Sequence, residues 1–408
     1  MLKRVFALLF SLLLTVSCVA CSDGQGNSET DVSSETSQAV SDTSDTSDSS
    51  KTSDSSVSAD KNSGNKDKKP GPPVDSPTPT DPDAVVYDAS MEHKIICCDV
   101  RNESIVVLDL NQCEEWDDVN TSACKVWEWV PRKESTCKYF HLVGTGIDDA
   151  KFRYSSYYKT DVVIATSSRG WAAVIEYPSG KVLWESPILY SPHSIEMLPN
   201  GDIVVACSGG NKWSTNGTLY YYPLSSGDST VCSSVKLPSA HGLCWDPSQE
   251  ILWGLGMDEI TGYRVLDGGT VNARLEAMEG KRVTFARDNG GHDLVPAFGQ
   301  PGKYWATCVA GIWLFDSHTM TITSDVDYRS IYTGKDIKGV AYFADGTMIQ
   351  SRAGYGNNTA SAYGATILAT FTLSAKESDP SKIQATRGAI SFDSREFYKV
   401  HTFTKNYQ

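Results

Sequence analysis

The stretch Ser191-Pro-His-Ser-Ile-Glu-Met-Leu-Pro-Asn-Gly-Asp-Ile-Val-Val-Ala206 decides the fold of this chain. It predicts a strand that starts at a histidine, a Pro-Asn-Gly-Asp turn and a second, nearly all-apolar strand. Similar stretches begin at Ala240, Gly291 and Ile337, and a weaker copy begins at Lys151. The corresponding residues 151, 193, 241, 292 and 338 are separated by 42, 48, 51 and 46 positions. A period of this length is typical of β-propeller blades.

The repeats predict an all-β chain folded as a six-bladed β-propeller. Blade one takes four strands, at residues 84–90, 94–99, 104–110 and 125–130, and blade two runs from residue 151 to 185. Blades three, four and five begin at His193, His241 and His292, and blade six runs from Ile337 to residue 403. A seventh blade would require a degenerate copy within residues 112–150. Each blade in such a ring must cover its neighbour.

Composition and motifs exclude several classes of function. The 408 residues carry a formal charge of −14, which argues against a nucleic-acid binder. The chain has no G-x-S-x-G elbow, H-E-x-x-H helix, P-loop or dinucleotide fingerprint. Serine hydrolase, zinc protease, nucleotide-dependent and hydride-transfer activities therefore lack their usual support, and whether the chain is an enzyme stays open.

The first 20 residues have the features of a secretory signal. Lys3 and Arg4 precede an apolar run from Val5 to Val16, which is too short for a permanent membrane span. The following Ser17-Cys-Val-Ala-Cys21 resembles the lipobox of bacterial lipoproteins. This resemblance implies cleavage before Cys21 and lipidation of Cys21. We therefore expect the chain to be lipid-anchored at the extracellular face of a bacterial cell membrane.

Residues 21–82 are predicted to form a disordered tether, and residues 83–408 the propeller domain. The tether consists mainly of Ser, Thr, Asp, Lys and Pro, and it cannot bury enough apolar surface to fold. Residues 22–82 contain 12 acidic residues and 5 lysines, a net charge of −7. Half of the net negative charge of the chain therefore lies outside the predicted propeller domain.

Several cysteines and tryptophans are interpreted as packing residues. Cys97 and Cys98 should point to opposite faces of one strand, as packed thiols. Cys113 and Cys124 flank a polar loop and could pair in an oxidising compartment. Tryptophans recur at equivalent strand positions, which predicts packing between blades for Trp184, Trp253 and Trp305.

The channel of the propeller is where the sequence predicts a site. The innermost strand of each blade lines the channel, so residues at the start of these strands converge on the axis. They are Lys151, His193, His241, His292 and Lys338. Loops between second and third strands open on the same face and add Arg101, Arg169, Lys212 and Arg352, with Trp213 and Tyr355 as candidates for stacking on sugar rings.

A ring of basic groups at a funnel mouth concentrates anions. The leading hypothesis is therefore a monomeric surface lipoprotein that binds an anionic ligand, such as a uronate-containing or sulfated glycan, through this funnel. Catalysis is left undecided in this hypothesis.

A second hypothesis gives the three histidines a divalent transition metal, because neutral imidazoles suit such ions. Oligogalacturonate lyases are also propellers that hold a metal on three histidines and a glutamine, and Gln350 could complete a similar set here. In such a lyase Lys338 would be the base that removes the proton α to a uronate carboxylate, with Arg352 or the metal stabilising the intermediate. A third hypothesis makes the histidines structural and the chain a scaffold for a protein partner.

The pattern resembles a family of secreted bacterial six-bladed propellers whose function is not established. The resemblance covers residues 84–403 and depends on Ile105-Val-Val-Leu-Asp-Leu110, Val126-Trp-Glu-Trp-Val-Pro131 and the repeats that begin at histidine. More distantly, Gly180-Lys-Val-Leu-Trp-Glu185 is similar to quinoprotein-type blades, and Pro192-His-Ser-Ile-Glu-Met-Leu-Pro-Asn-Gly-Asp-Ile203 to arylsulfotransferase repeats. The resemblance implies a fold and no reaction.

Overall fold

The computed structural model describes residues 93–112, 121–143, 146–188, 190–210, 215–227, 229–285, 290–323, 336–354, 364–365, 367–373, 385–392 and 394–408. The predicted signal, Cys21 and the tether are outside these residues, as are Cys113, Lys212, Trp213 and Tyr355. The chain divides between Pro73 and Val74, and all the described residues belong to the second unit. No helix in the described residues is long and apolar enough to span a membrane.

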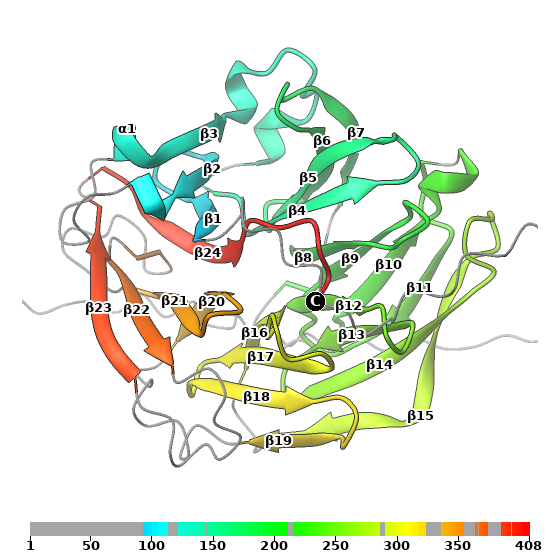
Figure 1. Ribbon diagram of the computed structural model, residues 1–408. Coiled ribbons are helices and arrows are strands. Elements are labelled where there is room, and N and C mark those ends of the chain that lie inside the picture. Colours follow the sequence, from blue (N-terminus) through cyan, green and yellow to red (C-terminus); the bar gives the residue numbers. More distant parts are fainter. Residues whose placement is uncertain are drawn as a thin grey trace, which may run out of the picture. The chain divides into compact units, whose positions relative to one another are not determined.

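The described strands form six four-stranded antiparallel sheets arranged around a central axis (Figure 1). Blades one and two are β24 (Phe397–Thr402), β1 (Lys94–Asp99), β2 (Ser104–Asp109) and β3 (Lys125–Trp129), then β4 (Asp149–Ser155), β5 (Thr160–Ser167), β6 (Trp171–Glu176) and β7 (Val182–Pro187). Blades three and four are β8 (Pro192–Met197), β9 (Ile203–Cys207), β10 (Thr218–Tyr222) and β11 (Ser233–Lys236), then β12 (Gly242–Asp246), β13 (Ile251–Leu255), β14 (Glu259–Leu266) and β15 (Arg274–Thr284). Blades five and six are β16 (Gly291–Pro296), β17 (Lys303–Cys308), β18 (Ile312–Asp316) and β19 (Thr321–Thr323), then β20 (Ile337–Tyr342), β21 (Thr347–Arg352), β22 (Ile367–Leu373) and β23 (Ala385–Ser391).

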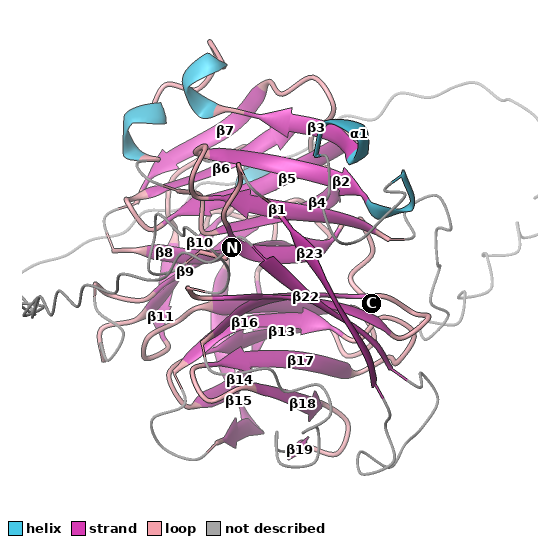
Figure 2. Cartoon of the chain, turned by 90° about the vertical axis from the view of Figure 1, so that its left-hand side faces the viewer, coloured by secondary structure: helices cyan, strands magenta, loops and turns pink. Residues whose placement is uncertain are grey.

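Short helical turns complete the described secondary structure. They are α1 (Thr121–Cys124) and the 3-10 turns Leu110–Gln112, Pro131–Lys133, Phe140–Leu142 and Leu224–Ser226. Figure 2 shows helical turns beside β3 and β7. The predicted all-β, six-bladed propeller is confirmed, and residues 112–150 supply no seventh sheet among the residues described there.

The C-terminal strand closes the ring. β24 pairs with β1, with His401 opposite Ile96 and Val400 opposite Cys97. The assignment of residues 396–403 to blade six was therefore wrong, because these residues form the innermost strand of blade one. The fourth strand of blade six is β23, which the repeat pattern did not identify.

The core consists of six buried apolar clusters, one between each pair of neighbouring blades. Because successive side chains of a strand point to opposite faces, one strand contributes side chains to two clusters. Cys97 packs toward blade six and Cys98 toward blade two, as predicted for these thiols. Trp253 and Trp305 are 0% and 1% exposed and pack against the next blade, so their packing role is also confirmed.

Candidate functional site

A ring of six side chains surrounds the axis where the innermost strands begin. Three of its members, His193, His292 and Lys338, occupy register shifts between the first and second strands of their blades. Such bulges redirect a side chain and are common beside functional sites. We call this set the mouth ring: Asp148, His193, His241, His292, Lys338 and Tyr398.

The same backbone conformation precedes four of these residues. Two positions before each one, the chain adopts a positive φ: 57° at Ser191, 48° at Ser239, 49° at Gly290 and 61° at Asp336. Left-handed backbone is uncommon outside glycine and often marks constrained turns. The same turn therefore delivers one side chain from each of blades three to six to the axis.

Neighbours in the mouth ring contact one another around the axis. His193 Nδ1 lies 3.5 Å from Asp148 Oδ1, and the rings of His193 and His241 stack with centroids 4.2 Å apart. His241 meets His292 edge to face at 5.8 Å. Lys338 Nζ lies 2.9 Å from His292 Nε2 and 5.9 Å from the centre of the Tyr398 ring. The chain thus brings together the three predicted histidines and Lys338.

The protonation of two histidines follows from their surroundings. Burial, and then the neighbouring His193 and His292, lower the pKa of His241 well below its usual value. Burial, and then the Lys338 ammonium, lower the pKa of His292 to about 3. Both imidazoles are therefore neutral near pH 7.

Hydrogen bonds select the tautomer of these two rings. His241 Nδ1 lies 2.7 Å from the carbonyl of Ser239 and must donate to it. His292 Nε2 accepts from Lys338, so the proton of His292 is on Nδ1. That buried Nδ1 has no hydrogen-bond partner among the described residues. The His292 ring therefore accepts from Lys338 on one nitrogen and carries, on the other, an N–H without an acceptor among the described residues.

The three histidines do not fit a shared metal ion. Within the described part of the chain, their ring nitrogens do not form a group of three within 4.8 Å of one another. His193 and His241 stack face to face, and His292 Nε2 already accepts from Lys338. Gln350 is buried in β21, where its amide nitrogen lies 3.2 Å from the sulfur of Met348. The arrangement therefore gives no support to the metal hypothesis.

Lys151 lies one layer below the mouth ring, so the register predicted for blade two was wrong. Asp148 donates its backbone N–H to Thr166, just as His241 donates to Leu255, which makes Asp148 the blade-two counterpart of the histidines. Lys151 is 4% exposed, and its amine bonds the carbonyls of Ile195 and Leu243 at 2.9 and 2.7 Å.

Lys151 belongs to a buried charge layer that closes the channel. We define this layer by its members: Asp149, Lys151, Glu196, Asp293, Lys399 and His401. Lys399 Nζ donates to the carbonyls of His193 and His241 at 2.9 and 3.0 Å and lies 3.3 Å from Asp293. His401 joins the carbonyl of Ala150 to the carboxylate of Asp293, at 2.9 and 2.7 Å.

Each carboxylate of the charge layer already lies beside a lysine or arginine. Burial alone would raise the pKa values of Asp149 and Asp293, but the surrounding cations Lys399, His401 and, for Asp149, Lys151 lower both. Asp149, Asp293 and His401 have ligand atoms close enough for a metal. Two lysine amines already lie against these carboxylates, at 3.5 Å from Asp149 and 3.3 Å from Asp293. We therefore interpret the cluster as ion pairs.

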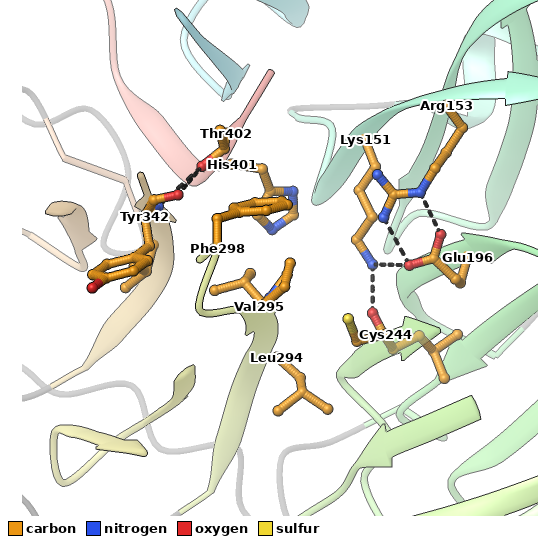
Figure 3. Close-up of a pocket in the computed structure, with 13 residues that line it drawn as sticks. Lys151, Arg153, Glu196, Cys244, Leu294, Val295, Phe298, Tyr342, His401 and Thr402 are labelled. Atoms are coloured by element: carbon orange, nitrogen blue, oxygen red, sulfur yellow. Dashed lines mark hydrogen bonds and ion pairs between the residues drawn. The ribbon is translucent and has the colours of Figure 1, made fainter. Parts of the chain in front are cut away.

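Below the charge layer lies a cavity of about 20 Å³, which has room for about one water molecule (Figure 3). Lys151 and Arg153 both point at Glu196 on one side of it, and Leu294, Val295 and Phe298 face them. Arg153 also lies 4.8 Å over the ring of Tyr407, in the C-terminal segment after β24. The lower cavity is too small for a glycan.

The predicted rim residues that the structure describes are all on the mouth face. Arg101 and Arg169 follow β1 and β5, and Arg352 ends β21. Arg101 lies 3.5 Å from the buried Glu396, whereas Arg169 is exposed. Asp148 and Tyr398 were missed. Each mouth-ring residue lies two positions before an apolar residue of its strand, such as Ile195 after His193 or Leu243 after His241. Aligning the blades on these apolar residues would have identified Asp148 and Tyr398.

Comparisons with known proteins concern the fold. No curated protein matches the chain. Similar solved structures include a protein of unknown function from Bacteroides caccae, with 10% identity, a TM-score of 0.45 and coverage of 76% of this chain and 97% of that chain. A functionally unknown protein from Desulfotomaculum acetoxidans has 9% identity, a TM-score of 0.44 and coverage of 75% and 84%. The model of a family of unknown function, DUF6528, matches residues 106–358, and the chain belongs to this family.

Proposed function

We propose that the mouth ring binds a carboxylate of an anionic ligand, with acidic glycans as the ligand class. One observation carries the proposal: the Lys338 amine lies at the mouth ring, 2.9 Å from Nε2 of the neutral His292 ring. The Lys338 ammonium would donate a charge-assisted hydrogen bond to a ligand carboxylate.

The depth of the channel limits where the ligand can bind. The charge layer lies directly below the ring, and its lysines already have carbonyl and carboxylate partners. The ligand must therefore stay on the mouth face, where the predicted cations Arg169 and Arg352 would help to concentrate anions. Catalysis is not part of this proposal. Anchoring through Cys21, and with it a ligand outside the cell, stays a prediction from the sequence.

Lys338→Met should weaken binding of a galacturonate oligomer at pH 7 at least tenfold, because it removes the only ammonium group among the described mouth-ring residues. Charge-assisted hydrogen bonds of this kind contribute about 1.5–3 kcal/mol. Isothermal titration calorimetry on the purified protein measures the effect.

The matched control is Lys181→Met. Lys181 is exposed in the turn between β6 and β7, on the opposite face. Equal binding by the Lys338→Met protein and the wild type would overturn the proposal. Unsaturated product formed in the same samples would support the lyase hypothesis.

A further inference from the structure

A serine, a histidine and an aspartate contact one another in sequence on one side of the mouth ring. Ser191 Oγ lies 3.2 Å from His193 Nε2, and Nδ1 of the same imidazole lies 3.5 Å from Asp148 Oδ1. A hydroxyl beside a base that a carboxylate orients is the arrangement of a Ser-His-Asp triad. Such triads occur on unrelated folds and are recognised by geometry, so they do not require the G-x-S-x-G elbow that this chain lacks.

Asp148 is fixed so that one of its carboxylate oxygens faces the imidazole. Its backbone N–H donates to the carbonyl of Thr166 at 2.8 Å, and its Oδ2 accepts from the backbone N–H of Ser168. Oδ1 faces His193 Nδ1, which favours the tautomer with the proton on Nδ1 and the lone pair on Nε2. At 3.5 Å this contact is longer than a hydrogen bond. Catalytic hydrogen bonds are often long before the substrate binds and shorten in the complex.

The matching turn of blade four shows what Asp148 adds. Ser239-Ala-His241 repeats the spacing of Ser191-Pro-His193, and the two serines have positive φ angles of 48° and 57°. His241 directs its Nδ1 to its own turn, 2.7 Å from the carbonyl of Ser239. The electrostatic neighbours of His241 are two histidines and a lysine, with no carboxylate among them. In blade three the imidazole instead directs Nδ1 to a carboxylate and Nε2 to a serine hydroxyl.

The serine of blade three is also the more accessible of the two. Ser191 is partly exposed, and the side chains of His193 and Asp148 are 15% and 12% exposed. Ser239 is 2% exposed. A small ester can therefore approach Ser191, whereas its counterpart in blade four is buried.

We propose that Ser191 and His193 are catalytic residues for the hydrolysis of small carboxylic esters, and that Asp148 positions the imidazole. Ser191 Oγ attacks the carbonyl carbon of the ester while its proton passes to His193 Nε2. The tetrahedral intermediate expels the alcohol, which takes this proton and leaves the acyl group on Ser191. Water then attacks the acyl carbon and gives a proton to His193. The carboxylic acid leaves as that proton returns to Ser191 Oγ. This activity goes beyond the binding proposed above and does not depend on Lys338.

The first test is labelling with a fluorophosphonate, which forms a bond from phosphorus to an activated serine oxygen and releases fluoride. Mass spectrometry of the labelled wild-type protein should find the adduct on Ser191. Ser191→Ala should remove this adduct, and His193→Gln should slow its formation by about 100-fold or more, because the base is lost. A wild-type protein without an adduct on Ser191 would overturn the proposal.

The second test is the hydrolysis of p-nitrophenyl acetate, measured by the absorbance of nitrophenolate. Ser191→Ala should lower kcat about 100-fold or more. Asp148→Asn should lower kcat at least about tenfold without raising KM, because substrate contacts remain while the imidazole loses its orientation. A raised KM with unchanged kcat in Asp148→Asn would contradict the positioning role.

Ser239→Ala is the matched control, because it changes the same turn in blade four and keeps the carbonyl that bonds His241. This variant should label and hydrolyse as the wild type does. Wild-type hydrolysis by Ser191→Ala, or equal losses in Ser191→Ala and Ser239→Ala, would overturn the triad. Either result would leave carboxylate binding at the mouth ring standing.

Discussion

Lys399→Met should destabilise the propeller by about 3–5 kcal/mol, the range found when one partner of a buried ion pair is removed. The Lys399 side chain is 0% exposed and joins β24 to three other blades, through the carbonyls of His193 and His241 and the carboxylate of Asp293. Methionine fills much of the space but leaves a buried carboxylate with one cation fewer. Urea unfolding followed by tryptophan fluorescence measures the change.

Two further variants make this result specific. Lys405→Met removes a partly exposed lysine that pairs with Asp161, and it should change stability by at most about 1 kcal/mol. Adding Asp293→Asn to Lys399→Met should recover part of the loss, because both charges are then absent. A Lys399→Met protein within 1 kcal/mol of the wild type would contradict the closing role of this lysine.

Acidification should destabilise the fold well before carboxylates titrate. An unfolded histidine takes up a proton near pH 6.5, but the folded-state pKa values of His241 and His292 are lower. Below pH 6.5 the unfolded chain therefore binds protons that the folded chain does not. Each histidine lowers the free energy of unfolding by about 1.4 kcal/mol per pH unit. This stability is fully present above pH 6.5 and is lost as the pH falls toward 3.

The measurement is urea unfolding at several values between pH 7 and pH 4.5. His292→Asn should reduce the slope of stability against pH by about 1.4 kcal/mol per unit in this range. His318→Asn, at an exposed turn, is the control. Equal slopes for His292→Asn and wild type would show that His292 is not held neutral by burial.

The repeat period was sufficient to predict the six blades and the convergence of the three histidines and Lys338. It could not fix the register of blade two, because Lys151 and Asp148 differ by three positions and both begin a polar-to-apolar stretch. The blades that carry His193, His292 and Lys338 have a bulge at that position, whereas β4 pairs with β5 without one. Hydrogen bonding of Asp148 to Thr166 resolves the choice.

The charge layer depends on contacts that no local pattern reveals. Lys399 donates to the carbonyl of His193, 206 positions earlier in the chain. His401 and Asp293 are 108 positions apart, and the closing strand, which contains His401, was assigned to blade six. Once β24 is placed in blade one, His401 and Asp293 lie 2.7 Å apart.

The central claim, that a carboxylate binds at the mouth ring, is tested most directly by ¹⁵N NMR of labelled histidines during titration with galacturonate oligomer. We expect the imidazole ¹⁵N signals of His292, assigned with His292→Asn, to move with saturation as the carboxylate binds the Lys338 ammonium that donates to this ring. The signals of His401, below the ring, should stay in place. Binding that shifts His401 or the exposed His318 while His292 stays unchanged would contradict the account.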